Sequence, residues 1–199
     1  DQFWKVTKIH RNSSRSFLEA NTMKTAFKTC TFMQSKCFLN EQAIVLTPES
    51  FQTNTVITDK YTQIVEKGAV LEIQKFGGYT VERTHGIHLV EAANKVLDQV
   101  ESKGFESLLT SQKQAWDSIW NMADISIEGD IKAQQAIRFN IFQLNQTYLG
   151  TDPQLNIGPK GFTGEKYGGS TYWDTEAYCL PFYMATKKQS VARTLLEYR

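Results

Sequence analysis

Apolar and polar positions alternate with the two-residue period of β-strands over roughly the first ninety residues. From Thr25 to Phe32, the run TAFKTCTF is dominated by β-branched and aromatic residues, which favour strands. We expect further strands at residues 55–58, 61–65, 69–76 and 79–84. Glu66-Lys67-Gly68 predicts a hairpin, and Gly77-Gly78 predicts a break before the last of these strands. Short strands at this spacing predict an antiparallel β-sandwich.

The apolar period changes to that of a helix near Glu91, and a second helix is expected over about 105–122. Asp130 has the position and chemistry of an N-cap for a third helix. One apolar stripe follows that cap, formed by Ile137, Ile141, Leu144 and Tyr148. Residues 151–170 form a glycine-rich and proline-containing loop, and a last helix is expected from near Asp174, with Pro181 tolerated in its first turns or kinking it.

Composition is typical of a globular chain that has no need of a polyanionic partner. Hydrophobic residues make up 41% of the sequence, and 22 basic residues balance 21 acidic ones to a net charge of +1. This balance does not favour nucleic acid or an anionic membrane as a partner, and no apolar run approaches the ~18 residues of a membrane span. The three cysteines form no CxxC pair, which predicts free thiols in a reducing, cytoplasmic compartment.

Several polar and aromatic groups have simple structural explanations. His85 and His88 are three residues apart and point to opposite faces of a strand, so they predict no metal site. Trp116 and Trp120 are spaced to stack along a helix. Asp124, Glu128 and Asp130 form an acidic cluster, which allows an acid–base pair but is explained as simply by capping.

The stretch KYGGSTYWDTEAYCLPFY, residues 166–183, leaves two interpretations open. It can be a glycine turn followed by a helix that Asp174 caps. It can also be a site for a polar ligand with flat faces, with aromatic rings against those faces and Asp174 accepting two hydroxyl groups. Sugars have this combination of surfaces.

The sequence KGFTGEKYGGSTYWDTEAYCLPFYMAT, residues 160–186, resembles the Trp-Asp-Thr-Glu segment of glycoside hydrolase family 65, which includes maltose, kojibiose and trehalose phosphorylases. IEGDIKAQQAIRFNIFQLNQT, residues 127–147, is similar to the start of that family's helical barrel. The resemblance implies an α+β multidomain fold with an antiparallel β-sandwich, a helical linker and an (α/α)6 barrel. We expect residues 1–90 to form part of the sandwich, 91–126 the linker and 127–199 the first part of the barrel.

The resemblance also implies a set of substrate-binding residues. It places Trp173 and Asp174 at the subsite for the transferred glucose, with Glu176 behind them. It assigns the lining of the pocket to Tyr167, Gly168, Gly169 and Tyr172. No catalytic residue is expected in this chain, because the family's general acid and phosphate site lie further downstream. The chain stops within a helical pattern, and we expect it to be a piece of a longer protein.

The activity implied by the resemblance is inverting phosphorolysis of a disaccharide, giving β-D-glucose 1-phosphate and D-glucose. Ser170, Thr171 and Tyr172 before Trp-Asp are similar to the maltose-specific members, so maltose is the expected substrate. Inorganic phosphate is the co-substrate, no other cofactor is expected, and the parent protein is expected to be a homodimer. The alternatives are another member of the family, including a trehalase-type hydrolase, or a non-catalytic sugar-binding piece.

Overall fold

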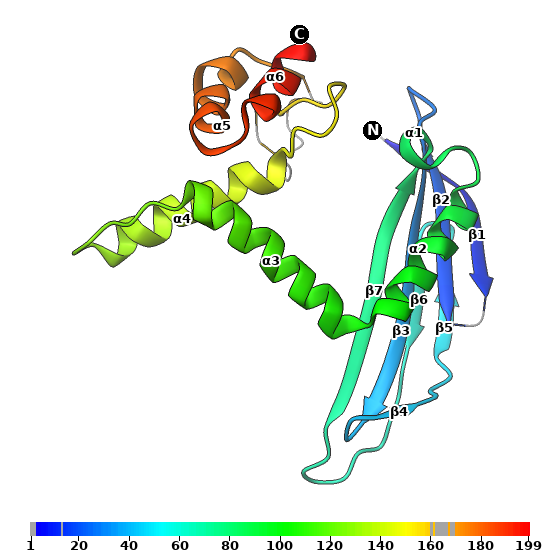
Figure 1. The fold of residues 1–199 in the computed structure, drawn as a ribbon. Helices are drawn as coiled ribbons and strands as arrows, with labels where there is room; N and C mark the ends of the chain where they lie inside the picture. Colours follow the sequence, from blue (N-terminus) through cyan, green and yellow to red (C-terminus); the bar gives the residue numbers. More distant parts are fainter. Residues whose placement is uncertain (1–2, 13, 160, 162–166, 168–169) are drawn as a thin grey trace. The chain divides into compact units, whose positions relative to one another are not determined.

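The computed structural model describes residues 3–12, 14–159, 161, 167 and 170–199 (Figure 1). Within it the chain forms two compact units, Asp1–Leu109 and Thr110–Arg199. The first is an antiparallel sheet with helices packed on it, and the second is helical. An antiparallel sheet followed by helices is the fold class predicted from the sequence, and it is confirmed.

The sheet of the first unit is antiparallel throughout. Strand β3 is its centre, because it pairs with β2 and β4 along one edge and with β7 along the other. The sheet strands are β1 Trp4–Asn12, β2 Arg15–Thr22, β3 Lys28–Leu39, β4 Gln42–Ile44 and β7 Leu71–Val81. A separate antiparallel hairpin is formed by β5 Glu49–Gln52 and β6 Ile57–Lys60.

Strand β7 corrects the break predicted at Gly77-Gly78, because it continues through both glycines. Gly78 pairs with Phe32 of β3, and the Phe32 ring lies where a side chain at position 78 would stand. A Cβ atom on Gly78 would meet Cζ of Phe32 at 2.8 Å. The glycine is therefore required by a close aromatic neighbour, as when an aromatic ring covers a glycine on the opposite strand.

The strand predicted at residues 61–65 is wrong, because these residues are not in a strand. The turn beyond them does form, and Gly68 has the positive φ of 90° that favours glycine. Ile64 is 90% exposed and Val65 44%, so the β-branched side chains of this segment gain little burial that would favour pairing. His85, expected at a strand end, instead lies in the short helix α1 Glu82–His85.

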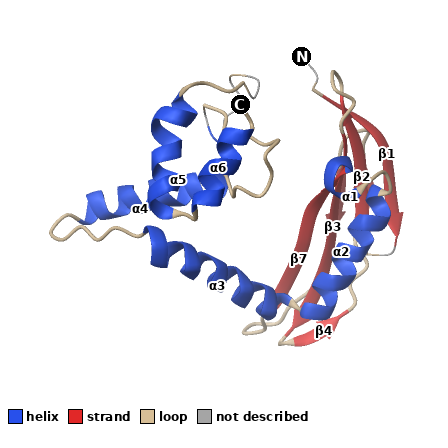
Figure 2. Cartoon of the chain, turned by 45° about the horizontal axis from the view of Figure 1, so that its top comes forward, coloured by secondary structure: helices blue, strands red, loops and turns tan. Residues whose placement is uncertain are grey.

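Helix α2, Leu89–Lys103, covers one face of the sheet, and its inner side contributes to the hydrophobic core of the first unit (Figure 2). Leu89, Ala93 and Leu97 of this helix pack against Phe17, Cys30 and Phe32, and all six are nearly inaccessible to solvent. Burial raises the pKa of Cys30 to about 11, so the thiol stays protonated at neutral pH.

An arginine of the sheet makes several polar contacts with α2 beside this core. Arg15 of β2 donates to Gln34 and Asn94 at 3.0 Å each and forms ion pairs with Asp98 at 2.8 Å and Glu101 at 3.1 Å. The Arg15 side chain is only 16% exposed, so its fork is fixed by packing as well as by charge.

The second unit contains three further helices and one wide turn. Helix α3, Phe105–Ala123, crosses the division between the units. The remaining elements are α4 Ile131–Thr147, a π-helical turn at Thr175–Cys179, α5 Leu180–Thr186 and α6 Gln189–Glu197.

Predictions made for individual side chains of this unit are confirmed. Asp130 caps α4 by accepting from the backbone N–H of Ala133 at 3.0 Å. Trp116 and Trp120 stack with ring centroids 5.9 Å apart, and Phe142 of α4 stacks on Trp116 at 5.0 Å. Along α4, the predicted stripe faces inward, with Ile141 and Tyr148 buried.

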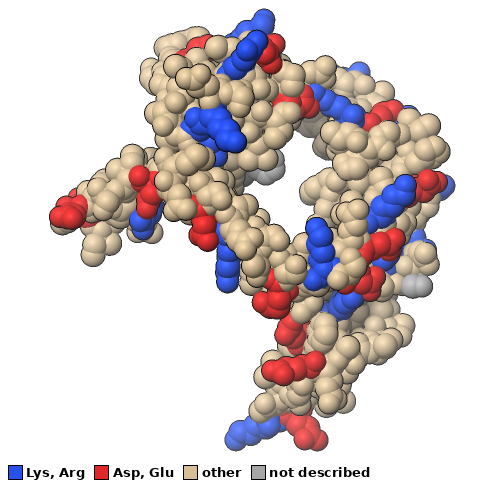
Figure 3. Space-filling view, viewed as in Figure 1, with Lys and Arg blue, Asp and Glu red and all other residues tan. Residues whose placement is uncertain are grey.

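On the face shown in Figure 3, Lys and Arg side chains are interspersed with Asp and Glu side chains. No extended surface of one sign is visible there, as expected for a nearly neutral chain. Among the described helices, none combines the length and the apolar character that crossing a membrane needs.

The contact between Gly78 and Phe32 leads to a stability prediction. We expect Gly78→Ala to lower the free energy of unfolding by about 1–3 kcal/mol, because the new methyl group overlaps the ring. Calorimetric melting of the two proteins measures the change. Phe32→Leu added to Gly78→Ala removes the obstructing ring, so the double variant should lose less than the sum of the single variants. Additive losses would contradict the proposed clash.

Candidate functional site

The segment Tyr172–Cys179 enters the helical unit through a π-helical turn. In that turn the backbone N–H of Leu180 donates to the carbonyl of Thr175, one residue further back than in an α-helix. The next residue, Pro181, has no N–H to donate, and in an α-helix its ring would crowd the carbonyl of Ala177. The wide turn accommodates the proline and allows α5 to begin with it in the first turn. Such turns are rare and recur at functional sites.

Asp174 stands immediately before this turn, and its carboxylate is exposed. Its φ and ψ of −53° and −33° are helical, and its side chain makes no capping hydrogen bond. The part of the chain that the structure describes offers this carboxylate no hydrogen-bond donor. The capping interpretation therefore applies to the backbone position of Asp174 but not to its carboxylate.

Two adjoining cavities meet at Tyr172 and Asp174. One, of about 180 Å³, is bounded by these two residues, by Gln143 and Leu144 of α4 and by neighbouring loop residues. The other, of about 270 Å³, is bounded by Pro159, Tyr167, Tyr172 and Asp174. Each volume is below the roughly 300–1,000 Å³ of cavities for drug-sized ligands, so each has room only for a smaller group.

The structure brings together some, but not all, of the residues predicted for the site. Tyr167 and Tyr172 meet edge to face with ring centroids 5.8 Å apart, beside Asp174. Trp173 is 67% exposed, lines neither cavity and packs beside Tyr178 with ring centroids 6.0 Å apart. Gly168 and Gly169 lie outside the described residues.

Glu176, predicted to lie behind the site, is bound by an arginine that sequence reasoning missed. Arg199 donates from Nε and Nη2 to the two carboxylate oxygens of Glu176, the second bond being 2.6 Å long. The same Nη2 donates to the backbone carbonyl of Tyr172 at 2.7 Å. Hydrogen bonding by Arg199 lowers the pKa of Glu176, so this carboxylate is ionised at neutral pH.

The cavities rest on a small core of the helical unit. Tyr183 of α5 is completely buried beside Tyr148, Ile157, Ala192 and Leu195. Its hydroxyl donates to the carbonyl of Leu144 in α4 at 2.7 Å, and burial raises its pKa. Thr175 reaches the same core, donating to the carbonyl of Ile157 at 3.4 Å. The turn after Asp174 is thereby fixed to α4 and to the loop that follows it.

Asp124 and Asp130 do not line either cavity. Asp124 accepts two hydrogen bonds from Arg138, at 2.9 and 2.6 Å, which lower its pKa. Asp130 is occupied as the cap of α4. Asp124 and Asp130 thus each have a structural partner.

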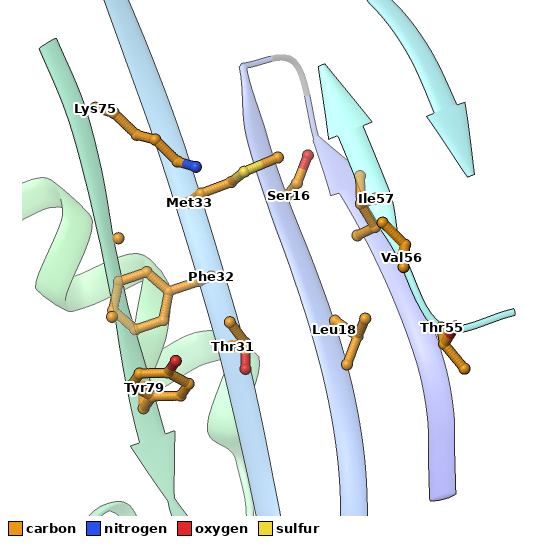
Figure 4. Close-up of a pocket in the computed structure, with 12 residues that line it drawn as sticks. Ser16, Leu18, Thr31, Phe32, Met33, Thr55, Val56, Ile57, Lys75 and Tyr79 are labelled. Carbon is orange, nitrogen blue, oxygen red and sulfur yellow. The ribbon is translucent and has the colours of Figure 1, made fainter. Parts of the chain in front are cut away.

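A larger groove of about 500 Å³ lies on the sheet, between its open face and residues 55–57 (Figure 4). Its lining is mainly apolar, with Leu18, Met33 and Ile57 among the side chains that Figure 4 shows around it. Lys75 is the charged residue in that lining. It offers no counterpart to the carboxylate and paired rings at Asp174, so we place the candidate site at Asp174.

Two family models match the chain. Residues 1–119 match the model for the N-terminal domain of glycosyl hydrolase family 65, and residues 138–199 match that family's central catalytic domain. A solved structure described as "Putative kojibiose phosphorylase from human microbiome" superposes with a TM-score of 0.79 and 27% identity, over 99% of this chain and 25% of that one.

Individual relatives agree with the family models. The maltose phosphorylase of Bacillus subtilis (strain 168) is 40% identical over 100% of this chain and 26% of its own length. The kojibiose phosphorylase of Caldanaerobacter subterraneus subsp. tengcongensis is 40% identical over 69% of this chain and 17% of its own. The α,α-trehalose phosphorylase of Thermoanaerobacter brockii is 38% identical over 67% and 17%. The chain therefore spans about a quarter or less of the length of these relatives.

Two buried tyrosines under the site provide a matched test of its scaffold. Tyr183→Phe removes the bond to Leu144, and we expect it to lower the free energy of unfolding by about 1 kcal/mol. The hydroxyl of Tyr148 is buried without a partner among the described residues, so Tyr148→Phe should be neutral or stabilising. Denaturant unfolding of both variants measures the difference, and equal losses would refute this account.

Proposed function

Because the chain belongs to glycosyl hydrolase family 65, we propose that it is the part of an inverting disaccharide phosphorylase that binds the transferred glucose. On this proposal, residues 1–90 belong to the N-terminal sandwich, 91–126 to a helical linker and 127–199 to the start of the catalytic barrel. The homodimeric parent and the cytoplasmic location stay predictions.

The observation that carries the proposal is that a carboxylate which makes no capping hydrogen bond lies beside flat aromatic rings at the two cavities. Asp174 can accept hydrogen bonds from two neighbouring sugar hydroxyls, and a charged acceptor makes stronger bonds than a neutral one. Tyr167 and Tyr172 offer apolar faces for the C–H surface of the same ring. Trp173, which lines neither cavity in this structure, is proposed to shape the subsite from its outer side.

Maltose is the disaccharide that we propose. A relative named a maltose phosphorylase is 40% identical over the whole chain, whereas an α,α-trehalose phosphorylase of Geobacillus stearothermophilus, which matches 92% of the chain, is 33% identical. The residues before Trp173 support the same choice, since Ser170, Thr171 and Tyr172 are similar to those of maltose-specific members.

The proposed reaction divides its tasks between this chain and the rest of the protein. A carboxylic acid outside this chain protonates the glycosidic oxygen, and inorganic phosphate attacks the anomeric carbon from the opposite face. Phosphate is already an anion, so no second carboxylate is needed to activate it. The products are β-D-glucose 1-phosphate and D-glucose. Within this chain, Asp174 and the tyrosines bind and orient the glucose that is transferred.

Phosphate dependence separates the proposed phosphorylase from a hydrolase of the same family. We expect the full-length protein to cleave maltose only when inorganic phosphate is present, with one glucose 1-phosphate released per maltose. The measurement is glucose and glucose 1-phosphate release with and without phosphate, with kojibiose and trehalose as parallel substrates. Cleavage at the same rate without phosphate would identify a hydrolase, and no cleavage in either condition would support a non-catalytic binding piece.

The role of Asp174 is tested by Asp174→Asn in the full-length protein. Losing one or two charged hydrogen bonds, each about 1.5–3 kcal/mol, should lower kcat/KM for the disaccharide by at least about tenfold. The melting temperature should not change, because the carboxylate makes no capping bond. Asp117→Asn, at an exposed position of α3, is the matched control. Activity of Asp174→Asn equal to that of the control would remove Asp174 from the site.

A further inference from the structure

We propose that Arg199 is a positioning residue for the sugar subsite, which acts by fixing the chain on both sides of Asp174. This inference rests on the proposed function and adds a residue to it. Arg199 follows the last turn of α6, whereas the segment that it holds precedes α5. It reaches neither cavity, so it can act on a sugar only through the groups that it binds.

The guanidinium of Arg199 makes its contacts from one edge. Nε and Nη2 bind the carboxylate of Glu176, and Nη2 also binds the carbonyl of Tyr172. These partners precede Arg199 by 23 and 27 residues, so the contacts tie the turn to α6 across the helical unit. Because a guanidinium is planar and rigid, the two partners are held at a fixed separation.

The two partners flank Asp174 closely in the chain. The carbonyl of Tyr172 lies two residues before it, and the side chain of Glu176 lies two residues after it. Asp174 has no side-chain capping bond of its own to fix its direction. Tyr172, whose carbonyl Arg199 holds, itself lines both cavities. The contacts of Arg199 with Tyr172 and Glu176, which we call the clamp, therefore fix the direction of the Asp174 carboxylate together with the position of the Tyr172 ring.

A second Arg–Glu pair on α6 shows what an ordinary surface pair looks like. Arg193 binds Glu197 one turn along the same helix at 3.1 Å, and its side chain is 81% exposed. That pair joins α6 only to itself. Arg199, whose side chain is 37% exposed, joins α6 to the segment at the cavities. A lysine at position 199 has one point of charge and cannot reproduce the forked contact to Glu176 together with the bond to Tyr172.

The test compares Arg199→Ala, Arg199→Lys and the control Arg193→Ala in the full-length protein. We expect Arg199→Ala to lower kcat/KM for the disaccharide by about 10- to 100-fold, the loss that a displacement of about 1 Å at a site can cause. The KM for phosphate and the melting temperature should match those of Arg193→Ala. Arg199→Lys should recover only part of the loss, and guanidinium ion at millimolar concentration should restore part of the activity of Arg199→Ala.

A double variant tests the mechanism of the clamp. If Arg199 acts through Glu176, Arg199→Ala combined with Glu176→Gln loses little more activity than Arg199→Ala alone. Glu176→Gln alone also serves if Arg199→Ala does not fold, and it should lower kcat/KM in the same direction. Arg199→Ala with the kcat/KM of the control, in a protein that Asp174→Asn inactivates, would overturn the clamp alone. An active Asp174→Asn would instead overturn the proposed site.

Discussion

A proline one residue into α5 determines how the chain enters the candidate site. Pro181 cannot donate to the carbonyl four residues before it, and its ring would crowd that group, so the helix begins with a wide π-helical turn. Asp174 precedes that turn with a helical backbone and an uncapped side chain. The direction of the Asp174 carboxylate therefore depends on contacts made by other parts of the unit. Tyr183 supplies one by anchoring α5 to α4, and Arg199 supplies another by binding Tyr172 and Glu176.

The predicted fold was correct where local pattern and packing agree. The stripe of α4 and its cap at Asp130 needed only the helical period and one short polar side chain, and both are observed. The strands were less certain, because a glycine pair has the same appearance in a turn and inside a sheet. Gly78 belongs inside β7 because Phe32, which precedes it by 46 residues in the chain, lies opposite it in the sheet. Residues 61–65 have strand-forming side chains, but Ile64 and Val65 stay exposed and the segment does not pair.

The candidate site likewise contains residues that the sequence predicted and residues that it did not. Tyr167, Tyr172 and Asp174 were proposed from their residue types and from the family resemblance, and all three line one cavity. Trp173 differs because its direction depends on how the turn before Pro181 is wound, which no spacing rule gives. Arg199 was missed because no pattern near it in the sequence predicts that it binds a carboxylate 23 residues earlier. The Arg193–Glu197 pair has the ordinary i, i+4 spacing of a helix, and it holds nothing beyond its own helix.

A comparison of three aspartates of the helical unit gives the clearest reason to assign a ligand to Asp174. Asp124 is bound by both nitrogens of Arg138, and Asp130 accepts from the backbone at the start of α4. Each of these carboxylates has a partner that stabilises the fold. Asp174 occupies a comparable place at the start of a helical segment, yet its side chain is exposed and no described residue donates to it. Sugar hydroxyls can therefore bind its oxygens without breaking a contact made by the described part of the chain. A carboxylate that has no partner within the described fold can bind a substrate at little cost in folding stability. Its neighbours in the chain hold it in one direction.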